Sequence, residues 1–327
     1  MENSRRTDCE LPGNASRASA VPYVMVMVAA IALWLTTGFT QAGAALPVAN
    51  GIDHAAASML RARHLALHDQ LATNPFNRPL VLESSEGSSA VNGEIFAVVP
   101  YTFDKVSKAL GASQGWCEIL ILHLNTKYCK IVPDGQGIGL LMNVGKKFDQ
   151  PLEQSYRLAF AWQLTDQRAE YLRVALKADT GPLSTRDYRI TLEAIPLENG
   201  TTFLHLSYAY GFGLGGKIAM LAYFNTVGRN KVGFSITGTE QDGQPTFING
   251  MRGQSERNTM RYYLAIESFL GALALPESAQ FEQRIGDWFN AVEHYPRQLH
   301  EMERVEYLMM KRKEYLRQQA DLPVASN

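Results

Sequence analysis

The sequence predicts an α+β protein organised around an antiparallel sheet, and the main observation behind this prediction is period-two patterning between residues 155 and 210. In the first run of that region, large apolar side chains share one face, at Tyr156, Leu158, Phe160, Trp162 and Leu164. The same alternation recurs at 172–177, 188–193 and 203–210. Helical segments that could cover the apolar face stand on both sides of this region in the chain. We therefore expect a sheet that is covered on one face only.

The composition is that of an ordinary globular protein and argues against one broad class of function. Hydrophobic residues make up 46% of the 327 residues, charged residues make up 19%, and the formal net charge is -1. A nucleic-acid-binding protein would normally show a basic face or domain. The charge balance therefore predicts no nucleic-acid partner.

The N-terminal region has the pattern of an export signal. An uncharged apolar run at 21–39 follows three arginines and leads to an Ala-Gly-Ala motif at 42–44. This run is long for the core of a signal peptide and close to the shortest membrane span, so residues 1–44 are either a cleaved signal peptide or a retained inner-membrane anchor. The positive flank stays cytoplasmic in either case. The body of the protein is therefore expected in the periplasm or outside the cell. The sequence is compatible both with membrane association and without it.

Export changes the interpretation of the cysteines. Cys9 precedes the apolar run, which leaves Cys117 and Cys129 as the pair in an oxidising compartment. A disulfide between them is the natural expectation, and two buried thiols are the alternative. His123 lies between the two cysteines, but a structural zinc site usually takes four ligands, often in close pairs. We expect no metal.

The segment before the sheet region should form helices and a hairpin. The expected elements are a helix at 52–72, a hairpin of 80–82 with 94–99, a short helix at 103–110, and a buried run at 116–124 whose periodicity fits either helix or strand.

The segment after the sheet region should be mainly helical. The expected elements are a helical piece near 217–226, a hairpin of 232–237 with 246–249, and a helix capped by Ser255 that runs through Gly271. Beyond Pro276, apolar residues follow alternating spacings of four and three, at Phe281, Ile285, Trp288, Val292, Tyr295, Leu299 and Met302. This heptad-like seam either packs on its own domain or contacts an oligomer or another partner.

Three segments carry a resemblance to a known superfamily: NGEIFAVVPYTFDKVSKAL with the following WCEIL, then YRITLEAIPLENGTTFLHLSYAY, then SERNTMRYYLAIESFL. In their order of elements they resemble the helix-grip fold of the START-related lipid-transfer domains and the wider polyketide-cyclase-like superfamily. The resemblance implies a curved antiparallel sheet wrapped around a C-terminal helix, with a hydrophobic cavity between them that commonly holds sterols, phospholipids or other apolar molecules. It carries over no catalytic residues, and the chain departs from the family around 211–231 and after Pro276.

The resemblance also suggests a division of the chain. The expected parts are a signal peptide or membrane anchor at 1–44, an N-terminal helical segment at 45–78, a helix-grip domain at 79–274 and a C-terminal helical extension at 275–327.

Candidate ligand-binding residues lie where the sheet and the covering helix would face each other. They are Trp162, Leu206, Tyr208 and Tyr210 of the sheet, with Tyr262, Tyr263, Ile266 and Arg257 of the helix. The apolar and aromatic members form core, or they line a cavity if the sheet curves away from the helix. Arg257 either lies on a solvated face with local ion pairs or holds a phosphate or carboxylate headgroup at the rim of the cavity.

Motifs for catalysis or for a cofactor are weak. The run GFGLGG at 211–216 fits the dinucleotide pattern formally, but the strand before it alternates and no βαβ unit precedes it, so we favour a flexible bend beside the cavity. His300-Glu301 lacks the second histidine of a zinc-protease helix, and GQSER at 253–257 fails as a nucleophile elbow. We expect no catalytic set and no cofactor.

The sequence thus favours an exported protein that binds, and carries, an apolar or amphipathic lipid-like molecule between sheet and helix. Two rivals stay open. One is an enzyme of the cyclase or hydrolase type in the same cavity, with His205 or a tyrosine as its acid or base. The other is an interaction protein of the cell envelope that acts through its C-terminal helix, also as a homo-oligomer.

Overall fold

A computed structural model describes residues 49–135, 137–216, 218, 226 and 228–320. The expected export signal lies outside the described residues, and so does most of the helical piece expected near 217–226. Among the described helices, none combines the length and the apolar character that crossing a membrane requires.

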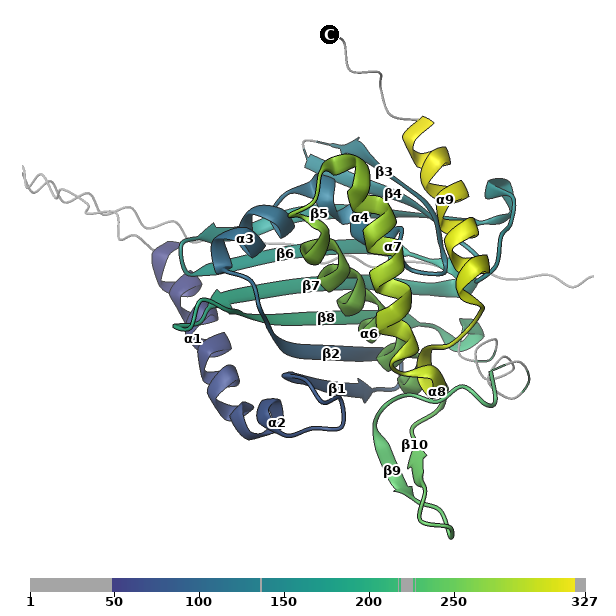
Figure 1. Ribbon diagram of the computed structural model, residues 1–327, viewed down its shortest axis with the longest axis horizontal. Coiled ribbons are helices and arrows are strands. Elements are labelled where there is room, and N and C mark those ends of the chain that lie inside the picture. The colour runs from purple at the N-terminus through teal and green to yellow at the C-terminus, as the bar shows by residue number, and fades with distance from the viewer. Residues whose placement is uncertain (1–48, 136, 217, 219–225, 227, 321–327) are drawn as a thin grey trace, which may run out of the picture. The chain divides into compact units, whose positions relative to one another are not determined.

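The described chain folds around one eight-stranded antiparallel sheet with the order β1-β2-β8-β7-β6-β5-β4-β3 (Figure 1). The strands are β1 (Leu80–Glu86), β2 (Ala90–Val99), β3 (Thr126–Asp134), β4 (Gly137–Val144), β5 (Tyr156–Arg168), β6 (Tyr171–Thr180), β7 (Thr185–Pro196) and β8 (Thr202–Phe212). The alternating runs of the sequence form β5 to β8, as predicted. A separate two-stranded hairpin is formed by β9 (Ile236–Thr239) and β10 (Pro245–Phe247), so a hairpin is present as predicted, but its first strand begins four residues later and its second ends two residues earlier than predicted.

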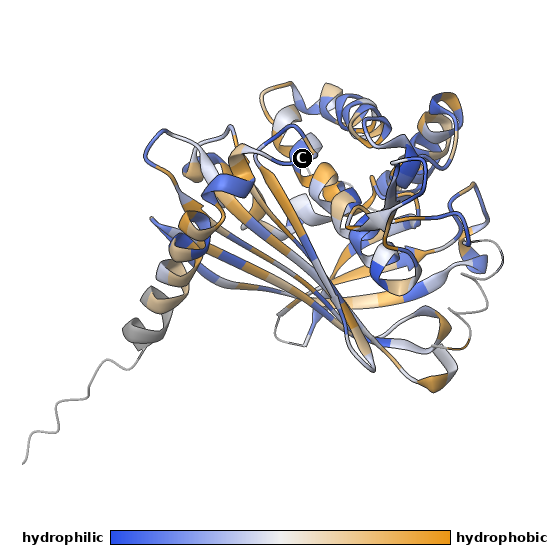
Figure 2. Cartoon of the chain, turned by 90° about the horizontal axis from the view of Figure 1, so that it is seen from below, coloured by the Kyte–Doolittle hydropathy of each residue, from blue (hydrophilic) through white to orange (hydrophobic). Residues whose placement is uncertain are grey.

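The helices cover the sheet mainly from one side (Figures 1 and 2). They are α1 (Ala49–Ala66), α2 (His68–Ala72), α3 (Phe103–Leu110), α4 (Ser113–Leu120), α6 (Gly250–Ala272), α7 (Glu277–Glu293), α8 (Pro296–Leu299) and α9 (Arg304–Ala320). The ambiguous run at 116–124 is therefore helical over its first part. The long helix α6 lies against β1, β2 and β8 and against α4 and α7, which is the helix-grip arrangement.

Helix α6 begins before the predicted cap. It starts at Gly250, whose φ of +65° is open to glycine, and Ser255 lies within the helix and is fully buried. A Cβ added at Gly93 of β2 would lie 3.0 Å from the Ser255 hydroxyl oxygen and still closer to Thr259. Ser255 is therefore a packing residue where the helix meets the sheet, and its predicted role as a cap is wrong.

The outer face of the sheet is also partly covered, which corrects the expectation of a sheet covered on one face only. Helices α1 and α2 bury a second, smaller core against it, made of Ala57, Leu60, Leu67, Leu71, Val81, Phe96, Tyr171, Ile195 and Phe203. Phe96 and Phe203 stack on each other with ring centroids 6.3 Å apart. These aromatic residues stand on the face that strict alternation assigns to solvent, and they provide the apolar surface on which α1 rests.

The C-terminal helices pack within the chain. The heptad-like residues of α7 are buried in the main core, and Trp288 stacks on Tyr307 of α9 at 4.9 Å. Helix α9 also brings Glu314 between two fully buried lysines, with its carboxylate oxygens 2.9 Å from Lys127 Nζ and 2.7 Å from Lys311 Nζ. The heptad-like residues of α7 therefore make their contacts within the domain.

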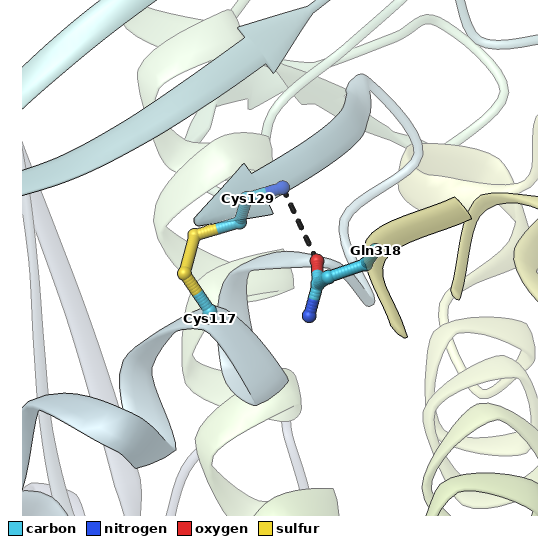
Figure 3. Close-up of a disulfide and its surroundings, with 3 residues drawn as sticks. All are labelled: Cys117, Cys129 and Gln318. Carbon is cyan, nitrogen blue, oxygen red and sulfur yellow. Dashed lines mark hydrogen bonds between the residues drawn. A yellow bond between two sulfur atoms is a disulfide. The ribbon is translucent and has the colours of Figure 1, made fainter. Parts of the chain in front are cut away.

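The predicted disulfide is present and joins α4 to β3, through Cys117 and Cys129 (Figure 3). The backbone N–H of Cys129 donates to Oε1 of Gln318 in α9 at 3.1 Å. Because both cysteines are bonded to each other, neither is available as a thiolate ligand for a metal.

Candidate functional site

An aromatic cluster lies between the inner face of the sheet and α6, and it contains three of the predicted ligand residues. We define the inner aromatic cluster as His123, Tyr188, Tyr208, Tyr210 and Tyr262. The Tyr262 ring of α6 lies 5.3 Å from Tyr208 of β8 and 4.9 Å from His123, measured between centroids. Tyr208 and Tyr210 are 5.8 Å apart. The helix and the sheet therefore share one continuous aromatic surface.

Tyr188 of β7 also belongs to this cluster, although it was not among the predicted ligand residues. It lies two positions before Ile190 and so shares the inner face of the strand. Its ring stacks nearly parallel on that of Tyr210, with centroids 5.4 Å apart and an interplanar angle of 18°. Beside it, the pairing of β7 with β8 shifts between Arg186 and Arg189, and Asp187 within the shift has a φ of +53°.

Two polar groups of the inner face are buried without a partner. The hydroxyl of Tyr210 and the indole N–H of Trp162 have no hydrogen-bond partner among the described residues. Tyr210 is 3% exposed and Trp162 is 9% exposed, so contact with bulk solvent is slight. A buried polar group without a partner costs about 1–3 kcal/mol. Such groups are uncommon in native interiors and often mark a functional site or a place for bound water.

The tyrosines of the cluster remain protonated at neutral pH. Burial raises the pKa of Tyr208, Tyr210 and Tyr262 above the ordinary value of 10.0, and nearby Tyr188 adds to this rise. A neutral phenol can donate a hydrogen bond but is a poor base. The cluster is thus suited to hold an oxygen acceptor.

His123 is a neutral donor in this surface. Its Nδ1 accepts the backbone N–H of Asn125 at 3.2 Å, which assigns the ring proton to Nε2. Burial lowers the pKa of His123 well below 6.5, and the nearby charges of Arg261, Lys311 and Lys147 lower it further. A polar contact with the side chain of Asn258 opposes this lowering of the pKa, but no described residue meets Nε2 in good hydrogen-bond geometry.

Positive charge gathers beside His123. We define the cationic cluster as Lys147, Lys231 and Arg261, which all bind the carboxylate of Glu301. Lys231 Nζ lies 2.8 Å and Arg261 Nη2 2.9 Å from Glu301 oxygens, and Lys147 also donates to Glu301. Burial, followed by the charge of Arg261, lowers the pKa of Lys147 to about 8. Burial opposes ionisation of Glu301, but Arg261 and Lys147 outweigh it and bring its pKa to about 2.

Other predicted ligand residues have different surroundings. Leu206 and Ile266 are core residues, each 1% exposed. Tyr263 lies apart from the cluster, since its hydroxyl donates to Glu267 at 2.6 Å and its ring lies under Arg78. Arg257 is 2% exposed and donates to the backbone carbonyl of Val232 at 3.0 Å. The structure places Arg257 in the packing of the segment beside α6, not at an open rim.

His205, the acid or base considered for an enzyme, faces away from the inner cluster. Its Nδ1 lies 2.9 Å from Glu193 and its Nε2 3.0 Å from Glu94, and its ring stacks on Phe96 at 4.4 Å on the outer face. Burial lowers the pKa of His205, but the hydrogen bonds to both carboxylates outweigh burial and raise it above 6.5. His205 is an imidazolium bridge between strands.

Two surface clefts are also present. One of about 840 Å³ is lined by Phe76, Arg78, Val98, Glu267 and Tyr295, among others. The other, of about 560 Å³, lies beside α3 at Phe103, Ser107 and Gln167. Neither cleft includes a member of the inner aromatic cluster. Among the described residues, no group of three or more histidine, cysteine, aspartate or glutamate side chains is placed to hold a metal ion.

Comparison with known proteins finds similarity in structure alone. No protein-family model matches the sequence, and no curated protein matches it. Truncated norcoclaurine synthase from Thalictrum flavum is similar at 15% identity and a TM-score of 0.31, over 44% of this chain and 91% of that chain. The same enzyme in complex with dopamine and hydroxybenzaldehyde matches at 15% identity and 0.30, over 46% and 82%. An aromatase/cyclase from Streptomyces matches at 13% identity and 0.29, over 62% and 96%. The helix-grip assignment itself rests on the strand order and on the position of α6.

Proposed function

We propose that this chain is a binding protein that holds one apolar or amphipathic small molecule with oxygen acceptors between the inner face of the sheet and α6. The observation that carries the proposal is the pair of buried, unpartnered donors, the Tyr210 hydroxyl and the Trp162 indole N–H. Separate oxygens of the ligand would satisfy these donors, because Tyr210 lies on β8 and Trp162 on β5 with two strands between them. The surrounding aromatic and aliphatic side chains would cover an apolar body.

The proposal includes export to the periplasm or the cell exterior. The disulfide between Cys117 and Cys129 supports it, because structural disulfides persist mainly in oxidising compartments. The proposed ligand is accordingly a lipid-like molecule of the cell envelope.

Binding is favoured over catalysis by the protonation states of the cluster. The raised pKa values of Tyr208, Tyr210 and Tyr262 keep these phenols neutral. His123 has its Nδ1 occupied by a backbone N–H and carries its proton on Nε2. These four side chains are therefore donors, and none of them is ready to act as a general base.

The test compares Tyr210→Phe with the matched variant Tyr171→Phe, whose hydroxyl donates to Glu193 on the outer face. Removing the unpartnered Tyr210 hydroxyl should leave the free protein as stable or more stable, by up to about 1 kcal/mol, whereas Tyr171→Phe should lose about 1.5–3 kcal/mol. Native mass spectrometry after purification from a membrane-containing host should show one bound small molecule in the wild type. That molecule should be depleted in Tyr210→Phe and kept in Tyr171→Phe.

A steric variant gives a second measurement. Leu206→Trp places a bulky ring on the inner face and should prevent uptake while the fold remains. If delipidated protein takes up no fatty acid, phospholipid, sterol or hopanoid-like molecule, and if Tyr210→Phe destabilises it as much as Tyr171→Phe does, the binding proposal is wrong. The interaction-protein alternative would then take its place.

A further inference from the structure

The inner aromatic cluster meets the cationic cluster at His123. On one side, the His123 ring stacks on Tyr262 at 4.9 Å, and Tyr262 continues to Tyr208. On the other side, Arg261 of the same helix binds Glu301 together with Lys147 and Lys231. Tyr262 belongs to the inner aromatic cluster and Arg261 to the cationic cluster, so two neighbouring residues of α6 join the apolar end of the site to its charged end.

The charged end runs from the surface into the interior. The side chains of Lys147 and Lys231 are 28% and 30% exposed, whereas that of Arg261 is 2% exposed and His123 is 3% exposed. Three cationic side chains pair with one carboxylate here, so the positive charges outnumber the negative charge of Glu301. Positive potential in a poorly hydrated site attracts an anion far more strongly than it would in water.

His123 contributes a directed donor to this positive region. Its Nε2–H is buried, and although the Asn258 side chain lies beside the ring, no described residue accepts from Nε2 in good hydrogen-bond geometry. The acceptor that complements a buried N–H beside several cations is an anionic oxygen, because a charge-assisted hydrogen bond is about twice as strong as a neutral one.

We infer that the ligand is an amphipathic acid whose carboxylate, phosphate or other oxyanion binds at the His123 end of the inner aromatic cluster, near Arg261 and Lys147. This inference rests on the proposed function, since it names the class of molecule that the same site holds. It also moves the headgroup site from the predicted Arg257, which binds the Val232 carbonyl, to the next turn of α6.

The test uses two fluorescent probes that differ in one anionic group: 1-anilinonaphthalene-8-sulfonate and the neutral N-phenyl-1-naphthylamine. We expect the sulfonate probe to bind wild-type protein about tenfold more tightly, with one molecule per chain. Lys147→Gln and His123→Phe should each weaken the sulfonate probe about tenfold and the neutral probe less than about twofold. Lys313→Gln removes an exposed lysine that pairs with Asp149, and it should change neither probe.

Competition distinguishes the possible sources of the anion. Decanoic acid, decanol, a lysophosphatidic acid and inorganic phosphate are each titrated against the bound sulfonate probe. Displacement by decanoic acid but not decanol indicates a carboxylate ligand, preferential displacement by the lysophosphatidic acid indicates a lipid phosphate, and displacement by inorganic phosphate indicates a free anion. The first two results support the inference. Displacement by inorganic phosphate as effective as that by the amphipathic acids would overturn it, because the site would then bind a free anion without an apolar body.

The two proposals fail differently. Equal affinity for both probes, with binding that Tyr210→Phe weakens, would show that the acid site is wrong. Unchanged affinity for the sulfonate probe in Lys147→Gln and His123→Phe would show the same. The proposal that the chain is a binding protein would remain in both cases. If neither probe binds, the proposed function fails and the acid site fails with it.

Discussion

Single residues of this protein show how strongly burial changes side-chain chemistry. His123 and His205 have the same ordinary pKa of 6.5, yet the pKa of His123 falls and that of His205 rises. His123 is surrounded by cations and loses its charge, whereas His205 lies between the carboxylates of Glu94 and Glu193 and keeps it. The difference follows from the neighbours of each ring, which lie far away in the sequence.

His205 should make stability depend on pH in a defined window. Because its pKa is raised, its contribution is fully present below 6.5 and is lost as the pH rises through the folded value. The pKa values of Glu94 and Glu193 are lowered from 4.5, so their contribution is present above 4.5 and is lost at lower pH. Urea unfolding should therefore show the greatest contribution of this bridge between about pH 5 and 6.5.

His205→Gln is the variant that checks this window. It should lose about 1–2 kcal/mol at pH 6, and the loss should become smaller as the pH rises through the folded pKa of His205, where the wild-type bridge loses its charge. A difference between the two proteins that stays the same over this rise in pH would contradict the imidazolium assignment.

At the scale of elements, the packing of α6 on the sheet depends on a close contact between the helix and β2. Gly93 of β2 lies directly beneath Ser255 and Thr259 of α6, and a Cβ there would overlap the Thr259 hydroxyl. The helix therefore comes closest to the sheet at β2, next to the strand that carries Tyr208 and Tyr210.

Gly93→Ala tests this close contact between α6 and β2. The added methyl should destabilise the protein by about 1–3 kcal/mol through overpacking. The control is Gly238→Ala in β9, where nothing lies within 4 Å of the new atom, so the change should stay within about 0.5 kcal/mol. Equal effects of the two substitutions in thermal or urea unfolding would rule out the tight contact.

Helix α9 is held by a buried ionic group, and Glu314 is its centre. Glu314→Gln would leave the ammonium groups of Lys127 and Lys311 buried without a counter-charge and should cost about 3–5 kcal/mol. Glu282→Gln removes the carboxylate of an exposed pair with Arg312 and should cost less than about 1 kcal/mol. Urea unfolding of both variants measures the contrast, and a small loss in Glu314→Gln would show that α9 is held by packing alone.

Periodic segments were the part of the fold that the sequence could predict. Strands β5 to β8 and helix α3 show a clear alternation or repeat because one face of each lies in the main core along most of its length, while burial on the outer face is confined to the part under α1 and α2. Strand β3 was missed because its first four residues are buried on both faces, between α4 and α9, and so show no alternation. Its Lys127 also looks like a surface residue until Glu314 is placed beside it.

The site was predicted less completely for a related reason. Tyr208, Tyr210 and Tyr262 were found because they lie on the apolar faces of regular elements. His123, Lys147 and Glu301 lie in connecting segments, and only the tertiary fold brings these three parts of the chain together. No local sequence pattern indicates that these three residues lie close together in the fold.

At the scale of the whole molecule, the disulfide links helix α4 to strand β3 of the sheet. Cys117 and Cys129 are 12 positions apart in the sequence, and the bond holds α4 against β3. On the chain-entropy estimate, closing a loop of this length contributes about 3 kcal/mol by restricting the unfolded chain.

Reduction should therefore lower the stability of the mature protein by about 3 kcal/mol, and Cys117→Ser with Cys129→Ser should do the same without reductant. Peptide mapping of the protein purified without reductant should find the two cysteines linked. Free thiols at both positions in that material would contradict the prediction, and an unchanged unfolding midpoint on reduction would contradict the magnitude.

The strand order has a consequence for biosynthesis. The hairpin of β1 and β2 is the first part of the sheet to be synthesised, but the partner of β2 is β8, which follows every other strand of the sheet. Until β8 arrives, β2 presents an open hydrogen-bonding edge with Ile95 bare on one face and Phe96 on the other. A nascent chain therefore carries an unpaired, aggregation-prone strand edge from the synthesis of Val99 until that of Thr202–Phe212, and chaperoning during this interval should affect how much protein reaches the native state.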